Sequence, residues 1–366
     1  MKLGDICDIN MGQSPSSETY NTNNSGIPFF QGNADFGERS PIVRIYCSKP
    51  TKIAKKGDIL FSVRAPIGAI NIADCECCIG RGLSALTPKK STTEYLFFLL
   101  KAKNKILQSL GTGSTFKAIN KNTLLSLPIS SHSINEQRII SNKLSLIENA
   151  IRIRERQLVK LNQLAKSRFI EMFGDPISNS KGWEITKLED LGELSRGISK
   201  SRPRNLPELL GGKYPLVQTG DVANSELYIT RYNSTYSELG LKQSKMWKAG
   251  TLCITIAANI AKTAILKFDA CFPDSIVGFK SNGKTNQIFI HYIFSFFQEL
   301  LESQAPTVAQ KNINLQTLQN LMVICPPSKF QNDFESFIQQ LDKSKFRAKK
   351  CLKLFSYMRH LRIIGI

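Results

Sequence analysis

The stretch ISNKLSLIENAIRIRERQLVKLNQLAKSRFIEM, residues 140–172, decides the architecture of this chain. Its apolar residues recur at alternating steps of four and three, which is the spacing of a heptad seam on a long helix. No proline or glycine interrupts it until Gly174-Asp175-Pro176. The sequence therefore predicts a helix on the order of 50 Å long, at 1.5 Å per residue. The seam positions are Leu144, Ile147, Ile151, Leu158, Leu161, Ala165 and Met172, with Arg154 and Arg168 in two further slots.

A second stretch keeps the same register 194 residues later, which is the distance from Lys117 to Lys311. An apolar stripe on a lone helix would face water, so each helix needs a partner. We expect the two helices to pair antiparallel, with the globular parts at opposite ends; the alternative is two independent helices, each folded onto its own domain. The second series is Phe334, Ile338, Leu341, Lys345, Ala348, Leu352, Phe355 and Arg359.

The rest of the chain contains a weak internal repeat. The shift of 194 residues also aligns TFKAIN at 115–120 with AQKNIN at 309–314, and Gln137 with Gln331. Earlier in each half the shift changes, as loops of different length would make it. The preserved order predicts one architecture used twice, with divergent surfaces. The earlier matches are KLGDI (2–6) with KLEDL (187–191), GQS (12–14) with GIS (197–199), PFFQ (28–31) with PLVQ (215–218) and KGDIL (56–60) with AGTLC (249–253).

Each globular half has short β-rich runs, separated by glycine and proline, followed by a helical stretch. Strands are expected at 57–64, 69–72 and 252–257, and helices at 95–110 and 289–303. The pattern predicts an α+β fold in which two similar mixed α/β domains are separated by two long antiparallel coiled-coil helices. The expected bounds are 1–134 for the first domain, 135–173 for the first spacer helix, 174–329 for the second domain and 330–364 for the second spacer helix.

The chain is strongly basic, although it has the composition of a folded protein. Of its 366 residues, 49 are Lys or Arg and 29 are Asp or Glu, giving a net charge of +20, while 42% are hydrophobic. Such an excess most often faces phosphates, in nucleic acid or on an anionic membrane, and a basic surface without a function is the alternative. No run approaches the ~18 apolar residues of a spanning helix, and the start MKLGD lacks the layout of a signal peptide. We therefore expect a cytoplasmic protein that binds nucleic acid and no membrane.

The sequence contains no clear catalytic or metal-binding pattern. The cluster Cys75, Cys77 and Cys78 lacks the second Cys/His pair of zinc sites, so we interpret it as part of a strand. There is no phosphate-binding loop, and the histidines have no partner motif. The string CPPS at 325–328 lacks the amide and the aromatic ring of a methyltransferase site and is interpreted as the exit of a strand. The chain is expected not to be an enzyme and to hold no metal or cofactor.

Several motifs resemble those of one protein family. MFGDP at 172–176, KGWE at 181–184 and KLEDL at 187–191 form a helix exit followed by a Gly-Trp entry into the second domain. The first half contributes GQSP (12–15), QG (31–32), VRAPIG (63–68) and IGRG (79–82). With the order domain, helix, domain, helix over essentially the whole chain, these motifs resemble the specificity (S) subunit of type I restriction–modification enzymes.

The resemblance implies a sequence-specific DNA-binding subunit without catalytic activity. Each domain would be a target-recognition domain that reads one part of a split double-stranded target. The helices would set the distance between the parts and bind two methyltransferase (modification) subunits, and restriction subunits would join the complex. S-adenosylmethionine, Mg²⁺ and ATP would be bound by those partner subunits. Since the first copy lacks the Gly-Trp pair and the second lacks the RAPIG run, the two domains are expected to read different half-sites.

Affinity in such a protein comes from Lys and Arg contacts to phosphates, and sequence choice from polar side chains at base edges. For each candidate an ordinary surface role is the alternative, and Arg64 and Arg81 have internal ion pairs as another. For the whole protein the alternatives are an RNA-binding module and a scaffold whose basic surface meets an acidic partner. The candidate base readers are Gln13, Ser14, Gln31, Arg64 and Arg81 in the first half and Ser199, Arg202, Gln218, Asn259 and Lys262 in the second; candidates for phosphate or base contact are Ser114, Thr115, Lys117, Gln310 and Lys311.

Overall fold

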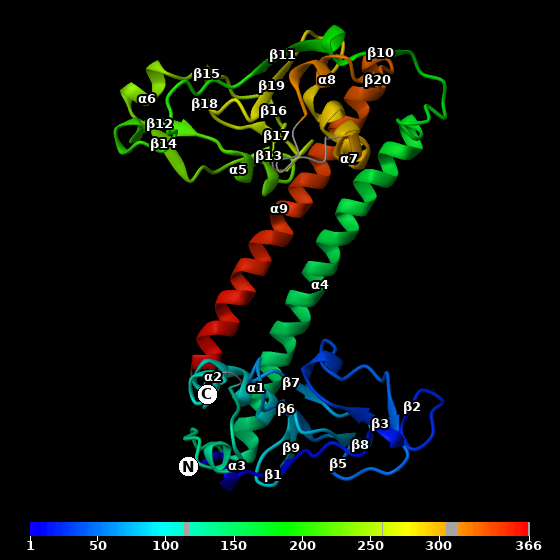
Figure 1. The fold of residues 1–366 in the computed structure, drawn as a ribbon, viewed down its shortest axis with the longest axis vertical. Helices are drawn as coiled ribbons and strands as arrows, with labels where there is room; N and C mark the ends of the chain where they lie inside the picture. Colours follow the sequence, from blue (N-terminus) through cyan, green and yellow to red (C-terminus); the bar gives the residue numbers. More distant parts are fainter. Residues whose placement is uncertain (113–116, 258, 305–312, 365–366) are drawn as a thin grey trace. The chain divides into compact units, whose positions relative to one another are not determined.

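The computed structural model describes residues 1–112, 117–257, 259–304 and 313–364. The chain divides into two compact units, of which the first is Met1–Arg156 with Ala348–Ile366 and the second is Gln157–Arg347. Each unit contains one end of each of two long helices, α4 at Ile134–Phe173 and α9 at Ser328–Ile364 (Figure 1). None of the described helices is long and apolar enough to cross a membrane.

In the part of the chain that the structure describes, the first unit contains two sheets and three short α-helices in addition to the ends of α4 and α9. Its strands are β1 Cys7–Met11, β2 Tyr20–Asn21, β3 Ile27–Phe30, β4 Tyr46–Cys47, β5 Ile53–Ala54, β6 Ile59–Ser62, β7 Ile70–Ile72, β8 Cys77–Ile79 and β9 Leu83–Pro88; its helices are α1 Thr93–Ala102, α2 Asn104–Ser109 and α3 Lys121–Leu125. One sheet has the antiparallel order β1-β9-β6-β7. The other has the order β2-β4-β3-β8-β5, in which β3 and β8 run parallel.

Strand β6 is buried on both faces because each face meets a different core. Ile59 and Phe61 belong to the core that α1 covers, whereas Leu60 belongs to the core between the two sheets. Successive side chains of a strand point to opposite faces, so burial on both sides requires an unbroken apolar run such as ILF at 59–61. Cys77 and Cys78 are fully buried on β8, which agrees with the prediction of a strand, whereas Cys75 lies before the strand and is half-buried. Among the described residues, no group of three His, Cys, Asp or Glu side chains is arranged to hold a metal ion.

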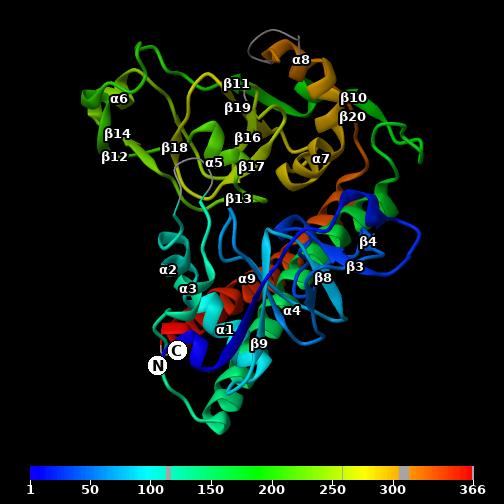
Figure 2. The same ribbon diagram turned by 60° about the horizontal axis from the view of Figure 1, so that its bottom comes forward.

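The second unit repeats this plan with an additional strand pair. Its strands are β10 Ile185–Lys187, β11 Gly192–Arg196, β12 Leu210–Leu216, β13 Tyr228–Ile229, β14 Ser234–Tyr236, β15 Met246–Trp247, β16 Leu252–Thr255, β17 Thr263–Leu266, β18 Ala270–Cys271, β19 Ile276–Ser281 and β20 Met322–Ile324; its helices are α5 Thr219–Ala223, α6 Glu238–Lys242, α7 Gln287–Gln304 and α8 Leu315–Gln319. The sheets have the orders β11-β19-β16-β17-β13, β14-β12-β18-β15 and β10-β20. In both views, α7 and the sheet of β14, β12, β18 and β15 lie on opposite sides of the five-stranded sheet (Figures 1 and 2).

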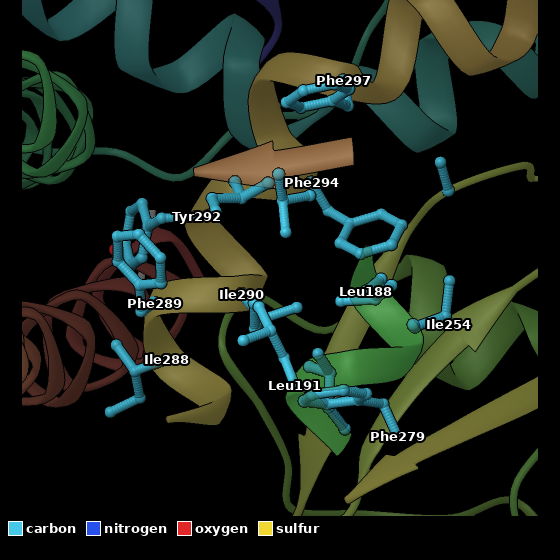
Figure 3. Packing of buried hydrophobic residues seen from close by; sticks show 14 of the residues in the cluster. Leu188, Leu191, Ile254, Phe279, Ile288, Phe289, Ile290, Tyr292, Phe294 and Phe297 are labelled. Atoms are coloured by element: carbon cyan, nitrogen blue, oxygen red, sulfur yellow. The ribbon is translucent and has the colours of Figure 1, made fainter. Parts of the chain in front are cut away.

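The largest core of the second unit joins α7 to the five-stranded sheet on one side and to the long helices on the other. Ile290 and Phe294 of α7 point toward Leu188, Leu191 and Ile254 (Figure 3). On its opposite side, α7 places Phe289 and Tyr292 against aromatic rings of α4 and α9, with the ring centroids of Phe173 and Phe289 4.9 Å apart and those of Tyr292 and Phe334 5.1 Å apart.

Within the second unit, α4 and α9 pack directly against each other. The ring of Phe334 lies 5.4 Å from that of Phe169 and 5.6 Å from that of Phe173, measured between centroids. The last turns of α4 therefore lie against the first two turns of α9, so the pair is antiparallel here and the two helices are not independent. Phe169 and Phe173 are fully buried although the heptad pattern does not include them. They face α7, a contact that spacing along one helix does not reveal.

The predicted seam agrees with the burial of side chains along both helices. Every seam position that the structure describes is buried or half-buried, including the charged Lys345, of which 7% is exposed. The side chain of Arg359 lies outside the described residues. Helix α4 begins at Ile134, earlier than its apolar pattern at Ile140, because Ser133 and Glu136 form a capping box: Glu136 N–H donates to Ser133 Oγ (3.3 Å) and Ser133 N–H to Glu136 Oε2 (2.8 Å).

Equivalent backbone contacts confirm the internal repeat. The Leu3 N–H donates to the Leu127 carbonyl oxygen and the Leu188 N–H to the Leu321 carbonyl oxygen, both at 2.9 Å. The turns before β6 and β16 both place glycine at positive φ, Gly57 at 92° and Gly250 at 89°. The single helix predicted at 95–110 is instead two helices, α1 and α2, which meet at Lys103. The helix predicted at 289–303 corresponds to α7, and the CPPS string leads from β20 into α9 as expected.

Candidate nucleic-acid interface

Three separate segments of the first unit meet at one edge of its sheets. The Gly12 N–H donates to the Leu83 carbonyl oxygen (2.9 Å), and the Gln13 N–H to that of Ile79 (3.0 Å). The turn between β8 and β9 is joined to the end of β3 by the Gly80 N–H, which donates to the Phe30 carbonyl oxygen (2.9 Å). These bonds bring together the predicted residues Gln13, Ser14, Gln31 and Arg81, and the Arg81 N–H donates to Ser14 Oγ (3.2 Å).

Glycines permit this close approach of the three segments. A Cβ atom at Gly12 would lie 2.2 Å from the Gly80 carbonyl oxygen, and one at Gly82 would lie 2.5 Å from the Gln31 carbonyl oxygen. Both distances are too short for any side chain, so these positions require glycine. The GQS and IGRG motifs therefore pack directly against each other through their backbones.

Arg64 and Lys117 extend the same edge. The Val63 N–H donates to the Gly82 carbonyl oxygen (3.0 Å), which places Arg64 next to the β8–β9 turn. Arg64 in turn forms a β-bridge with Ala118, the residue after Lys117. Gln13, Gln31, Arg64 and Arg81 are exposed, and within the described part of the chain their side chains make no hydrogen bond or ion pair. Four long polar side chains are thus available to a ligand at this edge, and Lys117 is exposed beside them; Ser114 and Thr115 lie outside the described residues.

The second unit repeats the backbone of this edge with different side chains. Three hydrogen bonds of the first unit have counterparts in the same order: Gly12–Leu83 with Gly197–Ile276, Val63–Gly82 with Ile256–Ser275, and Ile119–Val63 with Ile313–Ile256, all with nitrogen–oxygen distances of 2.8–3.0 Å. This correspondence places Asp274 at the position of Arg81 and Ala257 at the position of Arg64. Gln218 keeps the place of Gln31, and both begin a turn in which their N–H donates to an aspartate, at 2.9 and 3.0 Å.

The side chains predicted to contact DNA in the second unit make more hydrogen bonds within the protein than those in the first unit. Ser199 is 6% exposed, and its hydroxyl has no partner among the described residues. Arg202 donates to the carbonyl oxygens of Ser199 (2.6 Å) and Ser201 (2.9 Å) and to Asp274. Lys262 Nζ donates to Gln298 Oε1 (3.0 Å). Gln218 is exposed and donates to Ser234 Oγ (3.4 Å), and Asn259 is exposed; Gln310 and Lys311 lie outside the described residues.

The structure adds Arg196, Arg204 and Asp274 to the second edge. Arg204 Nη2 donates to Asp274 Oδ1, Arg202 Nη2 donates to Asp274 Oδ2 (3.2 Å), and Arg196 Nε donates to the Asp274 carbonyl oxygen (2.9 Å). The Arg-Pro-Arg string at 202–204 is visible in the sequence. The carboxylate that holds it is not, because it lies about 70 residues further along the chain, in the β18–β19 turn.

Acidic and basic residues also join the first unit to its part of α4. Arg152 and Arg156 of α4 lie 3.6 and 3.7 Å from the Glu38 carboxylate. Arg39 pairs with Glu94 of α1 and, at 3.9 Å, with Glu148 of α4. These two arginines of α4 therefore lie beside Glu38 of their own unit, at the surface, since 68% of the Arg156 side chain and 64% of the Glu38 side chain are exposed.

The chain contains two copies of one mixed α/β unit. Each copy includes part of both long helices and an edge formed by polar loops (the loop edge). This duplication defines a recognition protein with two similar units. A family model described as the type I restriction modification DNA specificity domain matches residues 1–163 and 180–353. The chain belongs to this family, and the resemblance seen in its motifs is confirmed.

Two relatives from Methanocaldococcus jannaschii are similar to this chain. One, named as the specificity subunit of type I restriction enzyme MjaIX, is 24% identical over 395 residues, covering 98% of this chain and 90% of the relative. The other, given provisionally as the specificity subunit of type I restriction enzyme MjaX, is 39% identical over 160 residues, covering 43% of this chain and only 38% of the relative. These relatives are named as specificity subunits, which agrees with the prediction that the chain is not itself catalytic.

Solved structures share the fold. A crystal structure of the S subunit of a type I restriction–modification system from M. genitalium superimposes with a TM-score of 0.65 at 15% identity, covering 99% of this chain and 94% of the other. A second structure comes from work on the structural basis of complex assembly and conformational transition of the type I restriction–modification system. It gives a TM-score of 0.60 at 16% identity, covering 99% of this chain and 95% of the other. Such low identities establish the architecture and leave the ligand to be argued from this chain's own residues.

Proposed function

We propose that this chain is the specificity subunit of a type I restriction–modification complex, which reads a bipartite DNA target and directs partner methyltransferase and restriction subunits to it. The proposal rests on one observation. Equivalent backbone hydrogen bonds, the backbone frame, hold the loops at the edge of each unit, but the side chains exposed there differ between the units. Arg64 and Arg81 in the first unit correspond to Ala257 and Asp274 in the second. Because each base pair presents its own pattern of donors and acceptors in the major groove, different side chains on one frame select different half-sites.

The charge of the chain supports DNA as the ligand. An excess of 49 Lys and Arg over 29 Asp and Glu supplies the phosphate contacts from which most affinity for DNA comes. The exposed side chains at the loop edges supply the groups that discriminate between bases. Membership in a DNA specificity family favours this interpretation over RNA binding or a purely structural role.

We further propose that methyltransferase subunits dock on the long helices. Ile139, Leu146 and Ile153 lie seven residues apart on α4, so they share one face of the helix. They are 53%, 70% and 62% exposed and lie outside the buried seam. An apolar row of this kind on a solvent-facing helix is typical of a protein–protein contact. S-adenosylmethionine, Mg²⁺ and ATP belong, in this proposal, to the partner subunits.

Methylation mapping tests the proposal. The full chain is expressed in cells together with type I methyltransferase subunits, and methylated positions across the genome are compared with cells lacking the chain. A split motif that disappears without the chain supports the proposal and gives both half-sites. An unchanged methylation pattern refutes it. The RNA-binding and scaffold alternatives predict no selective retention of duplex DNA at raised salt, where nonspecific charge binding fades steeply.

A further inference from the structure

Asp274 replaces a free cation of the first unit with an anion. Arg81 lies in the turn between β8 and β9, and Asp274 lies in the corresponding turn between β18 and β19. Since the two turns hold the same place in the backbone frame, this change inverts the charge at the centre of the loop edge. The second unit restores positive charge from another segment, the residues that follow β11.

Asp274 holds two arginines of that segment, one on each carboxylate oxygen. Arg202 reaches Oδ2 (3.2 Å) and Arg204 reaches Oδ1. The carboxylate is 33% exposed and the two guanidinium-bearing side chains are 54% and 43% exposed, so the cluster lies at the surface. Two cations on one anion leave the cluster net positive, as an interface with DNA requires.

The two arginines differ in how many of their donors are used. To residues that the structure describes, Arg202 makes three hydrogen bonds, two from Nη1 to the carbonyl oxygens of Ser199 and Ser201 and one from Nη2 to Asp274. Three of its five N–H donors are therefore used, including both on Nη1. Among the described residues, Arg204 makes one hydrogen bond, to Asp274. Four donors remain on Arg204, enough for the two parallel bonds that an arginine makes to one base.

We propose that Arg204, oriented by Asp274, is the residue with which the second unit reads a guanine of its half-site. Arg202 instead stabilises the conformation of the loop. This inference rests on the proposed function. Guanine presents two acceptors, O6 and N7, to the major groove, and the arginine fork matches them. Asp274 is a positioning residue, because it fixes the guanidinium plane before DNA arrives and so lowers the conformational entropy lost on binding. Direct reading of a cytosine by Asp274 is disfavoured, since both of its carboxylate oxygens already accept hydrogen bonds from arginine.

Methylation mapping with variants of the full chain, expressed with the methyltransferase subunits, tests this inference. Arg204→Ala should relax the preference for guanine at one position of one half-site by about 5- to 150-fold, the range for loss of one bidentate contact. The other half-site should remain unchanged. Arg204→Lys keeps the charge without the fork and should relax the same position. Asp274→Asn should relax it partially, and Arg202→Lys should lower methylation at all sites without altering any base preference.

The outcomes separate the inference from the proposed function. If wild-type cells show no motif that depends on the chain, the proposed function is wrong. If that motif exists and Arg204→Ala leaves every base preference intact, the inference is wrong and the proposed function stands. The inference also fails if Asp274→Asn relaxes a cytosine that Arg204→Ala does not affect. Should Arg204→Ala abolish methylation altogether, Arg204→Lys decides: relaxation at one position supports the inference, and an intact motif overturns it.

Discussion

Replacing Gln331 with methionine should destabilise the second unit, because this side chain satisfies four polar groups at the start of α9. Gln331 is 1% exposed. Its Nε2 donates to the carbonyl oxygens of Pro326 (2.7 Å) and Lys284 (3.3 Å). Its Oε1 accepts from the Thr285 hydroxyl (2.9 Å) and the Asn286 N–H (3.3 Å). The glutamine thereby joins the first turn of α9 to the start of α7.

The magnitude follows from which of these groups water can reach. Methionine has nearly the same length but offers neither a donor nor an oxygen acceptor. The hydrogen bonds to Pro326 and Thr285 are buried, and each group left without a partner costs about 1–3 kcal/mol. The bonds to Lys284 and Asn286 are partly exposed, so water replaces them at small cost. The expected loss is therefore about 2–6 kcal/mol, a large fraction of the ~5–15 kcal/mol that stabilises a typical domain.

The first unit contains a comparison for this prediction. Gln137 occupies the equivalent place on α4, donating to the carbonyl oxygens of Lys90 (3.2 Å) and His132 (3.0 Å) and accepting from the Thr92 N–H (3.2 Å). All three bonds are partly exposed. Gln137→Met should therefore cost less, about 1–2 kcal/mol.

Hydrogen exchange during urea unfolding provides the assay, because a protein of two units need not unfold in one step and exchange reports each unit separately. The peptides that cover the starts of α7 and α9 report the second unit. Gln339→Met is the matched control, since Gln339 is exposed on the same helix and, within the described residues, its side chain bonds only to Glu335, at 3.1 Å. The reasoning is refuted if Gln331→Met costs no more than Gln339→Met, or if Gln137→Met costs as much as Gln331→Met.

Three further predictions concern the helices. Lys345→Met should destabilise the second unit by about 3–5 kcal/mol in hydrogen exchange, because it removes the ammonium 3.8 Å from the largely buried Asp342 and leaves that carboxylate without this cation. An unchanged or raised stability would contradict this. Burial, and then the charge of Lys345, lower the pKa of His291 to about 4. Because the folded state favours the neutral ring, the stability that this residue contributes should be fully present above pH ~6.5 and should be lost as the pH falls to about 4. His291→Phe should flatten this dependence of unfolding free energy on pH. Leu146→Asp, at a 70% exposed site, should weaken capture of purified methyltransferase at least 10-fold without lowering the melting temperature, and unchanged capture would remove α4 as the docking site.

The long helices and the repeat were predictable from sequence because their signals are local. A heptad seam is a spacing within one element, and buried side chains at Leu144 or Phe334 follow from it directly. The repeat was detectable along both halves, and most clearly where its shift is constant, from Lys117 to the end of the helices. Gln137 and Gln331 are equivalent in position and share three equivalent hydrogen bonds. Nothing in either helix pattern indicated Phe169 and Phe173, because most of their ring contacts are with α7.

The loop edges were predictable in part, for a reason that differs between the units. In the first unit, the glycines of GQS and IGRG have no side chain, so the two backbones pack together. The residues that form the sequence motifs are therefore the residues that form the contact. In the second unit the corresponding turn contains Asp274 in place of Arg81. The shift between Arg81 and Asp274 is 193 residues, as it is between KGDIL at 56–60 and AGTLC at 249–253, but IGRG at 79–82 and FPDS at 272–275 share no residue, so this correspondence is hidden from sequence. The Asp274–Arg204 contact depends on that hidden correspondence and emerges only from the folded chain.

The frame explains how one architecture accommodates two different loop edges. Backbone hydrogen bonds and close glycine contacts hold the β8–β9 turn in place, and they involve no atom of the Arg81 side chain. A substitution of that side chain therefore changes what the edge presents to a ligand while leaving the bonds that fix the turn intact. The second unit shows the consequence: its turn keeps the Gly197 and Ser275 contacts although an aspartate stands at the arginine position. Separation of the residues that hold the edge from those that face outward allows each unit to change its ligand preference independently.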